Sequence, residues 1–175
     1  MCSVSGVVAD ANYLIDYGRL QSQRHMYAQH TPIYVEQLVQ FLSNYKHTYT
    51  QFGSSRPFGV SLMYAGFDKV CGYQLYCSDP SGNYSAWKAH ATGKNAVASV
   101  STLKEDYKEG CSLKEALVLA MKVLGKSFDT AKPDPKRFEI GVVTRENGQT
   151  VQRILGAEEI GQLMEESKVF EEKKE

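Results

Sequence analysis

The middle of the chain constrains its fold more than any other part. Apolar and polar residues alternate over residues 58–64 and again over 70–76, a period that predicts strands with one buried face. Turn-forming residues follow each strand, at 66–69 and at 79–82, and residues 83–91 have the pattern of a third strand. Three strands joined by short turns form a meander, so the sequence predicts an antiparallel sheet.

Two helices are predicted ahead of this sheet. Asp10 is in position to cap the first, and Thr31-Pro32 begins a second that ends at Gly53. Their apolar stripes consist of Ala11, Leu14, Ile15 and Gly18 in the first helix and of Val35, Leu38, Val39, Leu42, Tyr45 and Tyr49 in the second. Because almost no loop separates the two helices, we expect an antiparallel pair.

Helical patterns return after the sheet. Gly93 ends the strand pattern, and a helix with Ala96, Val97, Val100 and Tyr107 on one face follows it. Ser112 and Glu115 have the spacing of a capping box, which opens another helix. The stripe of this helix consists of Leu113, Ala116, Leu117, Ala120 and Leu124.

The last part of the sequence predicts a hairpin and a closing helix. A linker over residues 132–135 leads to a strand over 138–144. Asn147-Gly148, a dipeptide that strongly favours a tight hairpin turn, joins this strand to another over 150–155. The closing helix carries Ile160, Leu163 and Met164 and runs into a charged tail.

This order of elements predicts the fold class α+β with antiparallel sheets. A Rossmann fold is disfavoured because strands and helix pairs occur in separate runs instead of alternating singly. One strand pattern, at residues 3–8, has no partner that the sequence identifies.

The charge of the chain argues against a protein that binds nucleic acid. Its 20 lysines and arginines balance 20 acidic residues, whereas nucleic-acid-binding proteins usually carry a basic surplus. The balance is uneven along the chain. Residues 157–175 hold seven glutamates against three lysines, which gives −4, so residues 1–156 carry +4.

A membrane protein is also disfavoured. The longest apolar run, residues 116–121, is far shorter than the roughly 20 residues that span a bilayer, and we expect no signal peptide. The four cysteines are Cys2, Cys71, Cys77 and Cys111. They include no CxxC pair, and Cys71 and Cys77 lie too far apart along one strand for a disulfide. We therefore expect reduced thiols in a cytosolic or nuclear protein.

Motifs of common enzymes are incomplete in this sequence. Residues 59–63 begin like a nucleophile elbow without its second glycine, and Gly93-Lys94 lacks the residues that complete a phosphate-binding loop. The histidines have no neighbours at metal-ligand spacing, so we expect no metal site and no cofactor.

Cys2 is the one candidate nucleophile. Removal of Met1 would place its thiol beside a free α-amine, an arrangement used in covalent catalysis. Alternatively, Cys2 is a small apolar residue at the start of a strand, since free cysteine packs like a small hydrophobe. The second interpretation is favoured because the sequence shows no activating environment for the thiol.

Two long segments carry distinctive motifs: residues 49–62 (YTQFG-x-x-RPFGVSL) and 74–89 (QLY-x-SDPSGNY-x-x-WKA), the latter followed by GKN at 93–95. Both segments resemble the α-type subunits of the 20S proteasome. Residues 106–110 (DYKEG) and 144–148 (TRENG), with the charged C-terminal tail, are similar to the alpha type-4 group, which occupies the α3 position of the ring.

The resemblance implies an N-terminal-nucleophile-hydrolase-like, four-layer αββα sandwich with antiparallel sheets. The family begins with a helix, a gate-forming tail and strands that have no counterpart in this sequence. We therefore expect an incomplete proteasome α-subunit domain over residues 1–165, missing its N-terminal helix and first strands, and a charged C-terminal tail over 166–175. Incomplete sheets expose strand edges, so we also expect the chain alone to be poorly soluble or to oligomerise.

The resemblance also implies a structural role. Members of this family form a heteroheptameric ring with neighbouring α subunits, dock on the β subunits, gate substrate entry and bind regulatory particles in ubiquitin-dependent protein degradation. It implies no catalytic residue, cofactor or metal, and it makes Cys2 an internal strand residue. The helices over 11–29 and 32–49 would face the β ring, and those over 95–107 and 112–128 would lie on the outer side.

Two alternatives stay open at this point. One is a truncated regulatory fragment that competes with a full-length subunit for ring partners. The other, which we disfavour, is a Cys2-dependent N-terminal-nucleophile hydrolase, whose activity Cys2→Ala would abolish.

Overall fold

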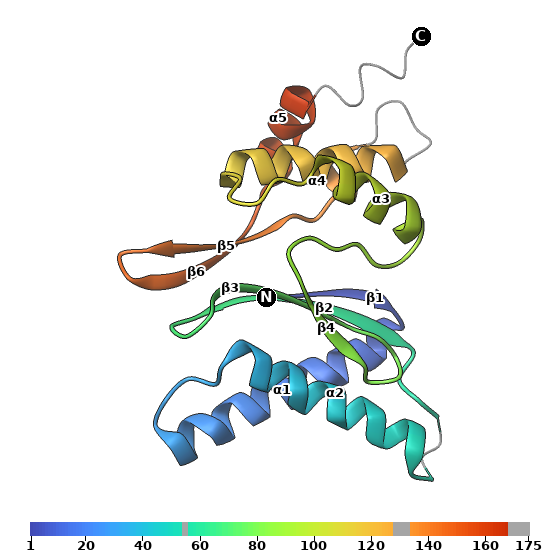
Figure 1. Cartoon of the computed structure of the whole chain (residues 1–175), viewed down its shortest axis with the longest axis vertical. Helices are drawn as coiled ribbons and strands as arrows, with labels where there is room; N and C mark the ends of the chain where they lie inside the picture. The colour runs from blue at the N-terminus through green and yellow to red at the C-terminus, as the bar shows by residue number, and fades with distance from the viewer. Residues whose placement is uncertain (54–55, 128–133, 168–175) are drawn as a thin grey trace. The chain divides into compact units, whose positions relative to one another are not determined.

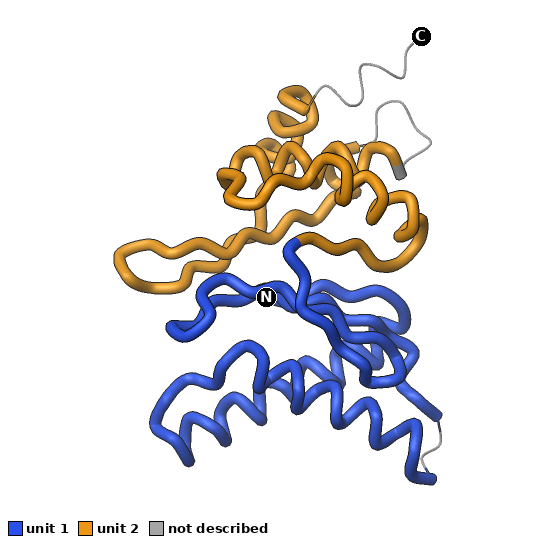
Figure 2. Tube along the Cα trace, viewed as in Figure 1, with its two compact units in different colours: residues 1–88 blue, residues 89–175 orange. Residues whose placement is uncertain are grey.

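The computed structural model describes residues 1–53, 56–127 and 134–167. The chain divides into two compact units, Met1–Lys88 and Ala89–Glu175 (Figure 2). The first unit contains β1 (Cys2–Gly6), α1 (Val8–Gln29), α2 (Val35–Gln51), β2 (Val60–Asp68), β3 (Gly72–Ser78) and β4 (Tyr84–Trp87). The second contains α3 (Ala96–Asp106), α4 (Leu113–Ser127), the 3₁₀ helix η1 (Pro135–Arg137), β5 (Gly141–Glu146), β6 (Gln149–Ile154) and α5 (Ala157–Ser167).

The first unit is built on an antiparallel sheet in the order β1-β2-β3-β4 (Figure 1). β1 pairs along β2 with Cys2 opposite Tyr64, which supplies the partner that the sequence did not identify for the first strand pattern. This strand is shorter than predicted because the chain turns into α1 after Gly6, whose φ is 122°. A Cβ at Gly6 would lie 2.3 Å from the Gly59 carbonyl oxygen, so only glycine fits this close approach.

The helices α1 and α2 cover one face of this sheet (Figure 1). Alternate residues of β2 point toward them, as the period of two requires. The core between helices and sheet consists of Ala11, Leu14, Val39, Leu42, Phe58, Val60, Leu62, Tyr64 and Tyr76. The predicted stripes of both helices thus supply buried residues, and the predicted antiparallel helix pair is confirmed.

Both helix starts were predicted wrongly. α1 begins at Val8, so Asp10 lies inside its first turn instead of capping it. α2 begins at Val35 instead of Thr31-Pro32, because the residues between the helices are used to reverse the chain direction. His30 closes α1 in a left-handed conformation with a φ of 55°. The Val35 amide donates to Asp68 Oδ2 at 3.2 Å, so the cap of α2 comes from the end of β2 and not from a neighbour in sequence.

The predicted meander is confirmed, with shifted bounds. β2 runs to Asp68 and so includes residues 66–68 of the segment predicted as a turn. The turn comes after the strand because the Asp68 carboxylate accepts hydrogen bonds from the Val70 and Cys71 amides. The turn at 79–82 is confirmed, and Asp79 Oδ1 accepts hydrogen bonds within it. β4 ends at Trp87, four residues before the predicted strand end.

The second unit contains a two-stranded antiparallel sheet, β5-β6, with helices packed against it. Its turn is the predicted Asn147-Gly148, with φ values of 49° and 79°. β5 begins at Gly141 instead of residue 138. The core consists of Met121, Phe138, Ile140, Val142, Leu155 and Ile160. Residues 132–133 of the predicted linker lie outside the described residues.

The capping box that opens α4 is confirmed. The Ser112 amide donates to Glu115 Oε2 at 2.7 Å, and the Glu115 amide donates to Ser112 Oγ at 3.3 Å. Helices with antiparallel sheets in both units confirm the predicted α+β class. α5 ends at Ser167, and most of the tail predicted at 166–175 lies outside the described residues. None of the described helices is long and apolar enough to span a membrane.

Candidate functional site

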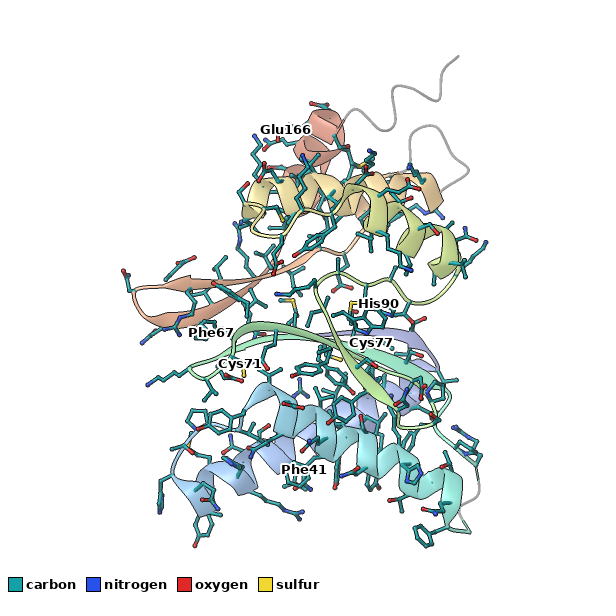
Figure 3. All side chains as sticks on the ribbon, viewed as in Figure 1. Phe41, Phe67, Cys71, Cys77, His90 and Glu166 are labelled. Carbon is teal, nitrogen blue, oxygen red and sulfur yellow. The ribbon has the colours of Figure 1, made fainter. Side chains whose placement is uncertain are left out.

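A groove lies on the helix pair of the first unit, between the C-terminal part of α1 and the N-terminal part of α2. Its volume is about 560 Å³. Its lining is mostly amide and aromatic, and includes His25, Tyr34, Gln37, Gln40, Phe41 and Asn44. Phe41 points away from the sheet (Figure 3). A groove with these side chains suits a protein partner better than a small charged ligand.

The same helix pair exposes further apolar side chains. Large hydrophobic residues that are exposed on it are Tyr13, Leu20, Met26, Tyr27, Tyr34 and Phe41. We call these residues, together with the groove, the helix-pair surface. Single exposed hydrophobic residues are ordinary, but several on one pair of helices beside an aromatic groove indicate a surface that binds another protein.

A cluster of aromatic rings joins α1, α2 and the segment before β2. The Tyr17 and Tyr45 rings are stacked, with centroids 4.1 Å apart and planes 21° apart. Phe58 packs its ring against Tyr49 at 4.7 Å. The hydroxyl oxygen of Tyr45 lies 2.9 Å from that of Tyr13 and 3.1 Å from that of Tyr49. These contacts hold the two helices in register and fix the edge of the helix-pair surface.

An ion pair anchors the start of α1 to the chain before β2. Arg56 donates to both carboxylate oxygens of Asp10, at 2.6 and 2.7 Å, and the Gly59 amide donates to Asp10 Oδ2 at 2.9 Å. The Arg56 bonds first, and then the Gly59 amide, lower the pKa of Asp10 to about 2. Asp10 is buried, whereas 61% of the Arg56 side chain is exposed. The carboxylate therefore serves to position the chain and is saturated with donors.

Lys46 is the most unusual charged residue in the described part of the chain. It is 0% exposed, and its Nζ donates to Val60 O at 3.0 Å, Ser78 Oγ at 2.9 Å and Asp79 O at 3.2 Å. Burial lowers the pKa of Lys46 to about 8. All three ammonium hydrogens have acceptors, which makes burial of the charge tolerable. Lys46 thus ties α2 to β2, β3 and the turn that follows.

The structure gives Cys2 a strand position. Its side chain packs beside the core under the helices, and the adjacent α-amine of Met1 donates to Ala65 O at 2.9 Å. Burial raises the pKa of the Cys2 thiol. Reactive cysteines need the thiolate form, so this environment supports the structural interpretation of Cys2 over the nucleophile.

The sequence did not predict the polar residues that connect the helices to the sheet. Lys46 occupies a polar gap in an apolar stripe, and Asp10 was assigned a cap that it does not form. Two sequence motifs contain the partners of these residues. The RPFG motif contains Arg56, which bonds to Asp10, and the SDPSG motif contains Ser78 and Asp79, which bond to Lys46. Among the described residues, no three histidine, cysteine or acidic side chains are placed to hold a metal ion.

Comparison with known proteins identifies the family to which the chain belongs. A family model described as "Proteasome subunit" matches residues 1–143. The chain belongs to the proteasome subunit family. "Proteasome subunit alpha type-4" of Dictyostelium discoideum is 44% identical over 173 residues, which are 98% of this chain and 69% of that protein.

Plant members of the family show the same relation. "Proteasome subunit alpha type-4-1" of Oryza sativa subsp. indica is 46% identical over 165 residues, 93% of this chain and 66% of that protein. "Proteasome subunit alpha type-4-A" of Arabidopsis thaliana is 49% identical over 150 residues, 86% of this chain and 60% of that protein. The predicted resemblance to α-type proteasome subunits, and to alpha type-4, is confirmed. The chain spans about two thirds of the length of these relatives.

Proposed function

We propose that the chain acts as a structural, non-catalytic subunit in the α ring of the 20S proteasome core. The observation that carries this proposal is the 44% identity to an alpha type-4 subunit over 98% of the chain. In this role the chain contributes to assembly of a heteroheptameric ring with neighbouring α subunits. It also contributes to substrate gating and to the docking of regulatory particles, in ubiquitin-dependent protein degradation in the cytoplasm and nucleus.

The helix-pair surface supports docking on β subunits. Obligate interfaces bury apolar and aromatic side chains at their centre, and α1 and α2 expose such residues around a groove. Exposed Phe41 lies in the groove lining, where a partner would bury it. We propose that this surface contacts the β ring.

The polar chemistry of the first unit supports a role without catalysis. The carboxylate of Asp10 and the ammonium of Lys46 are both occupied by intramolecular hydrogen bonds, and burial holds Cys2 in its thiol form. Catalytic groups need access to a substrate and a pKa suited to proton transfer or attack. We therefore propose no catalytic residue for this chain.

Affinity purification of the tagged chain from its own cells tests this function. Mass spectrometry of the retained proteins, after separation on a native gel, is expected to identify other α subunits and β subunits in particles the size of the core. Recovery of no proteasome subunit would overturn the proposal. Recovery of α subunits only in small complexes would favour the competing-fragment alternative instead.

A matched pair of variants locates the interface. Phe41→Asp places a charge in the proposed docking groove and is expected to reduce the recovered β subunits at least ~tenfold, because a buried unpaired carboxylate is costly. Val97→Asp, at a position on α3 that is 85% exposed, is expected to leave recovery unchanged. Equal recovery with both variants would place the β-subunit contact elsewhere.

A further inference from the structure

We propose that Tyr13 and Tyr45 form an oxidative cross-linking site, at which one-electron oxidation of each phenol joins α1 covalently to α2. Their hydroxyl oxygens are 2.9 Å apart, and their rings have centroids 6.1 Å apart with planes 20° apart. Because the carbons next to each hydroxyl are the positions at which tyrosyl radicals couple, touching hydroxyls bring the two reactive ring edges together. The site is proposed for the free chain, in which Tyr13 and the rest of the helix-pair surface are exposed.

The reaction balances with hydrogen peroxide as oxidant and a haem peroxidase as catalyst. Each phenol gives up one hydrogen atom, the peroxide O–O bond breaks, and the two hydrogen atoms end in two water molecules. The two phenoxyl radicals then couple through one ortho carbon of each ring. Both rings return to the phenol form as the hydrogen on each coupled carbon moves to oxygen, and the product has lost two hydrogens.

The surroundings of the pair favour oxidation at this place. The Tyr13 side chain is 55% exposed and lines a hollow of about 370 Å³ together with Tyr49 and Phe58, so an oxidant in solvent reaches it. Tyr45 lies behind it, half-buried, and stacks on Tyr17. Once both phenols have been oxidised, the two radicals are already in contact, which makes their coupling intramolecular and fast relative to reaction between molecules.

The hydroxyl chain also keeps Tyr45 in its neutral form. The hydrogen bonds to Tyr13 and Tyr49, followed by burial, raise the pKa of Tyr45 above its ordinary value. Loss of an electron from Tyr45 is thus coupled to movement of its proton along these hydrogen bonds. Two other pairs compete for Tyr45. Tyr49 lies on α2 like Tyr45, and their rings are tilted by 56°. The Tyr17 ring is stacked on the Tyr45 ring with centroids 4.1 Å apart, whereas the hydroxyl contact of Tyr45 on α1 is with Tyr13.

Peroxidase treatment of the purified chain tests the site. The Cys71→Ser variant serves as background, because the exposed Cys71 thiol competes for radicals. We expect dityrosine fluorescence that is independent of protein concentration. In a tryptic digest we expect one linked peptide pair, containing Tyr13 and Tyr45, with two hydrogens fewer than the sum of its parts.

Phenylalanine variants decide whether this pair is responsible. Tyr13→Phe and Tyr45→Phe keep the rings and are each expected to lower the fluorescence at least ~tenfold, because the intramolecular partner is lost. Tyr27→Phe removes a tyrosine that is 86% exposed on the same helix as Tyr13, and we expect no loss. A linkage at Tyr27, between Tyr17 and Tyr45 or between Tyr45 and Tyr49 would overturn the proposal. Fluorescence that falls on dilution, or undiminished signal in Tyr13→Phe, would overturn it as well.

Discussion

The two units use polar side chains in different ways. In the first unit, buried groups connect segments far apart in sequence: Lys46 bonds to Ser78, and Asp10 bonds to Arg56. In the second unit, the described ion pairs are partly or largely solvent-exposed, whether they are close in sequence, as Arg153 with Glu159, or distant, as Lys114 with Glu166. Buried polar groups are costly to leave unpaired, whereas exposed pairs contribute little. The first unit therefore depends on a few specific residues, and the second depends mainly on its apolar core and its local caps.

The largest expected effect is the removal of the buried ammonium. Lys46→Met fills similar space but leaves the acceptors Val60 O and Asp79 O without their donor, which we expect to lower the free energy of unfolding by about 3 kcal/mol. Urea denaturation followed by circular dichroism measures the loss. The matched variant in the second unit is Lys122→Met, which breaks a partly exposed ion pair with Asp106 and is expected to cost about 0.5 kcal/mol. Similar losses in both variants would contradict the contrast between the units.

A pair of glycines gives a second, smaller contrast. A Cβ at Gly82 would lie 2.4 Å from Ser43 O and 2.7 Å from the His47 amide nitrogen, at a φ of 87°. Gly82→Ala is therefore expected to cost about 2–3 kcal/mol, since both the backbone strain and the clash with α2 must be relieved. Gly148, at a φ of 79° in the hairpin of the second unit, has open space at its Cβ, so Gly148→Ala is expected to cost about 1 kcal/mol of strain alone. Thermal unfolding of the two variants side by side measures the difference, and a larger loss at Gly148 would contradict it.

The smallest expected effect is visible only in acid. Asp10 has a pKa near 2 in the folded chain against an ordinary value of 3.8, so the unfolded chain binds a proton first as the pH falls. The stability that ionised Asp10 contributes is complete above about pH 4 and is lost as the pH falls toward about 2. The urea midpoint of the native chain should therefore fall more steeply over this window than that of Asp10→Asn. Parallel curves would show that solvent around the exposed Arg56 screens the pair completely.

The sequence predicted best the features that depend on neighbouring residues. The Ser112–Glu115 capping box and the Asn147-Gly148 turn both form as predicted, because each is specified within four residues. The stripes of α1 and α2 and the antiparallel meander also follow from short periods, and they are confirmed. The stripes predicted for α3 and α4 are wrong, because Val97, Leu113 and Leu124 are exposed. The residues buried on these two helices include Ser99, Met121 and Val123 instead. In the second unit, the hairpin and the opening of α4 thus needed no knowledge of distant partners.

Features of the first unit that depend on distant residues were missed, because a local sequence pattern does not show which distant residue will be the partner. The start of α2 was placed at Thr31-Pro32 because both residues favour a helix start, whereas the donor at Val35 finds its acceptor 33 residues away in Asp68. Aspartate is suited to capping a helix, but Asp10 instead accepts hydrogen bonds from Arg56, which lies 46 residues later in the chain. The burial of Lys46 depends on acceptors in two strands and a turn, and a lysine in a helix is ordinarily expected at the surface. The helix-pair surface was predicted only through the family resemblance. The residues around Phe41 do not show that this phenylalanine is exposed instead of buried.

The Asp68 carboxylate ties two events of folding to each other. It accepts hydrogen bonds from the first amide of α2 and from the amides of Val70 and Cys71 in the turn between β2 and β3. The first turn of α2 therefore gains its cap only when Asp68, 33 residues away, has been brought to it, and we expect the helix start to form after this contact between distant segments. We expect the same link to make the start of α2 and the hairpin turn open together in the native state, with their amide protons exchanging as one cooperative unit.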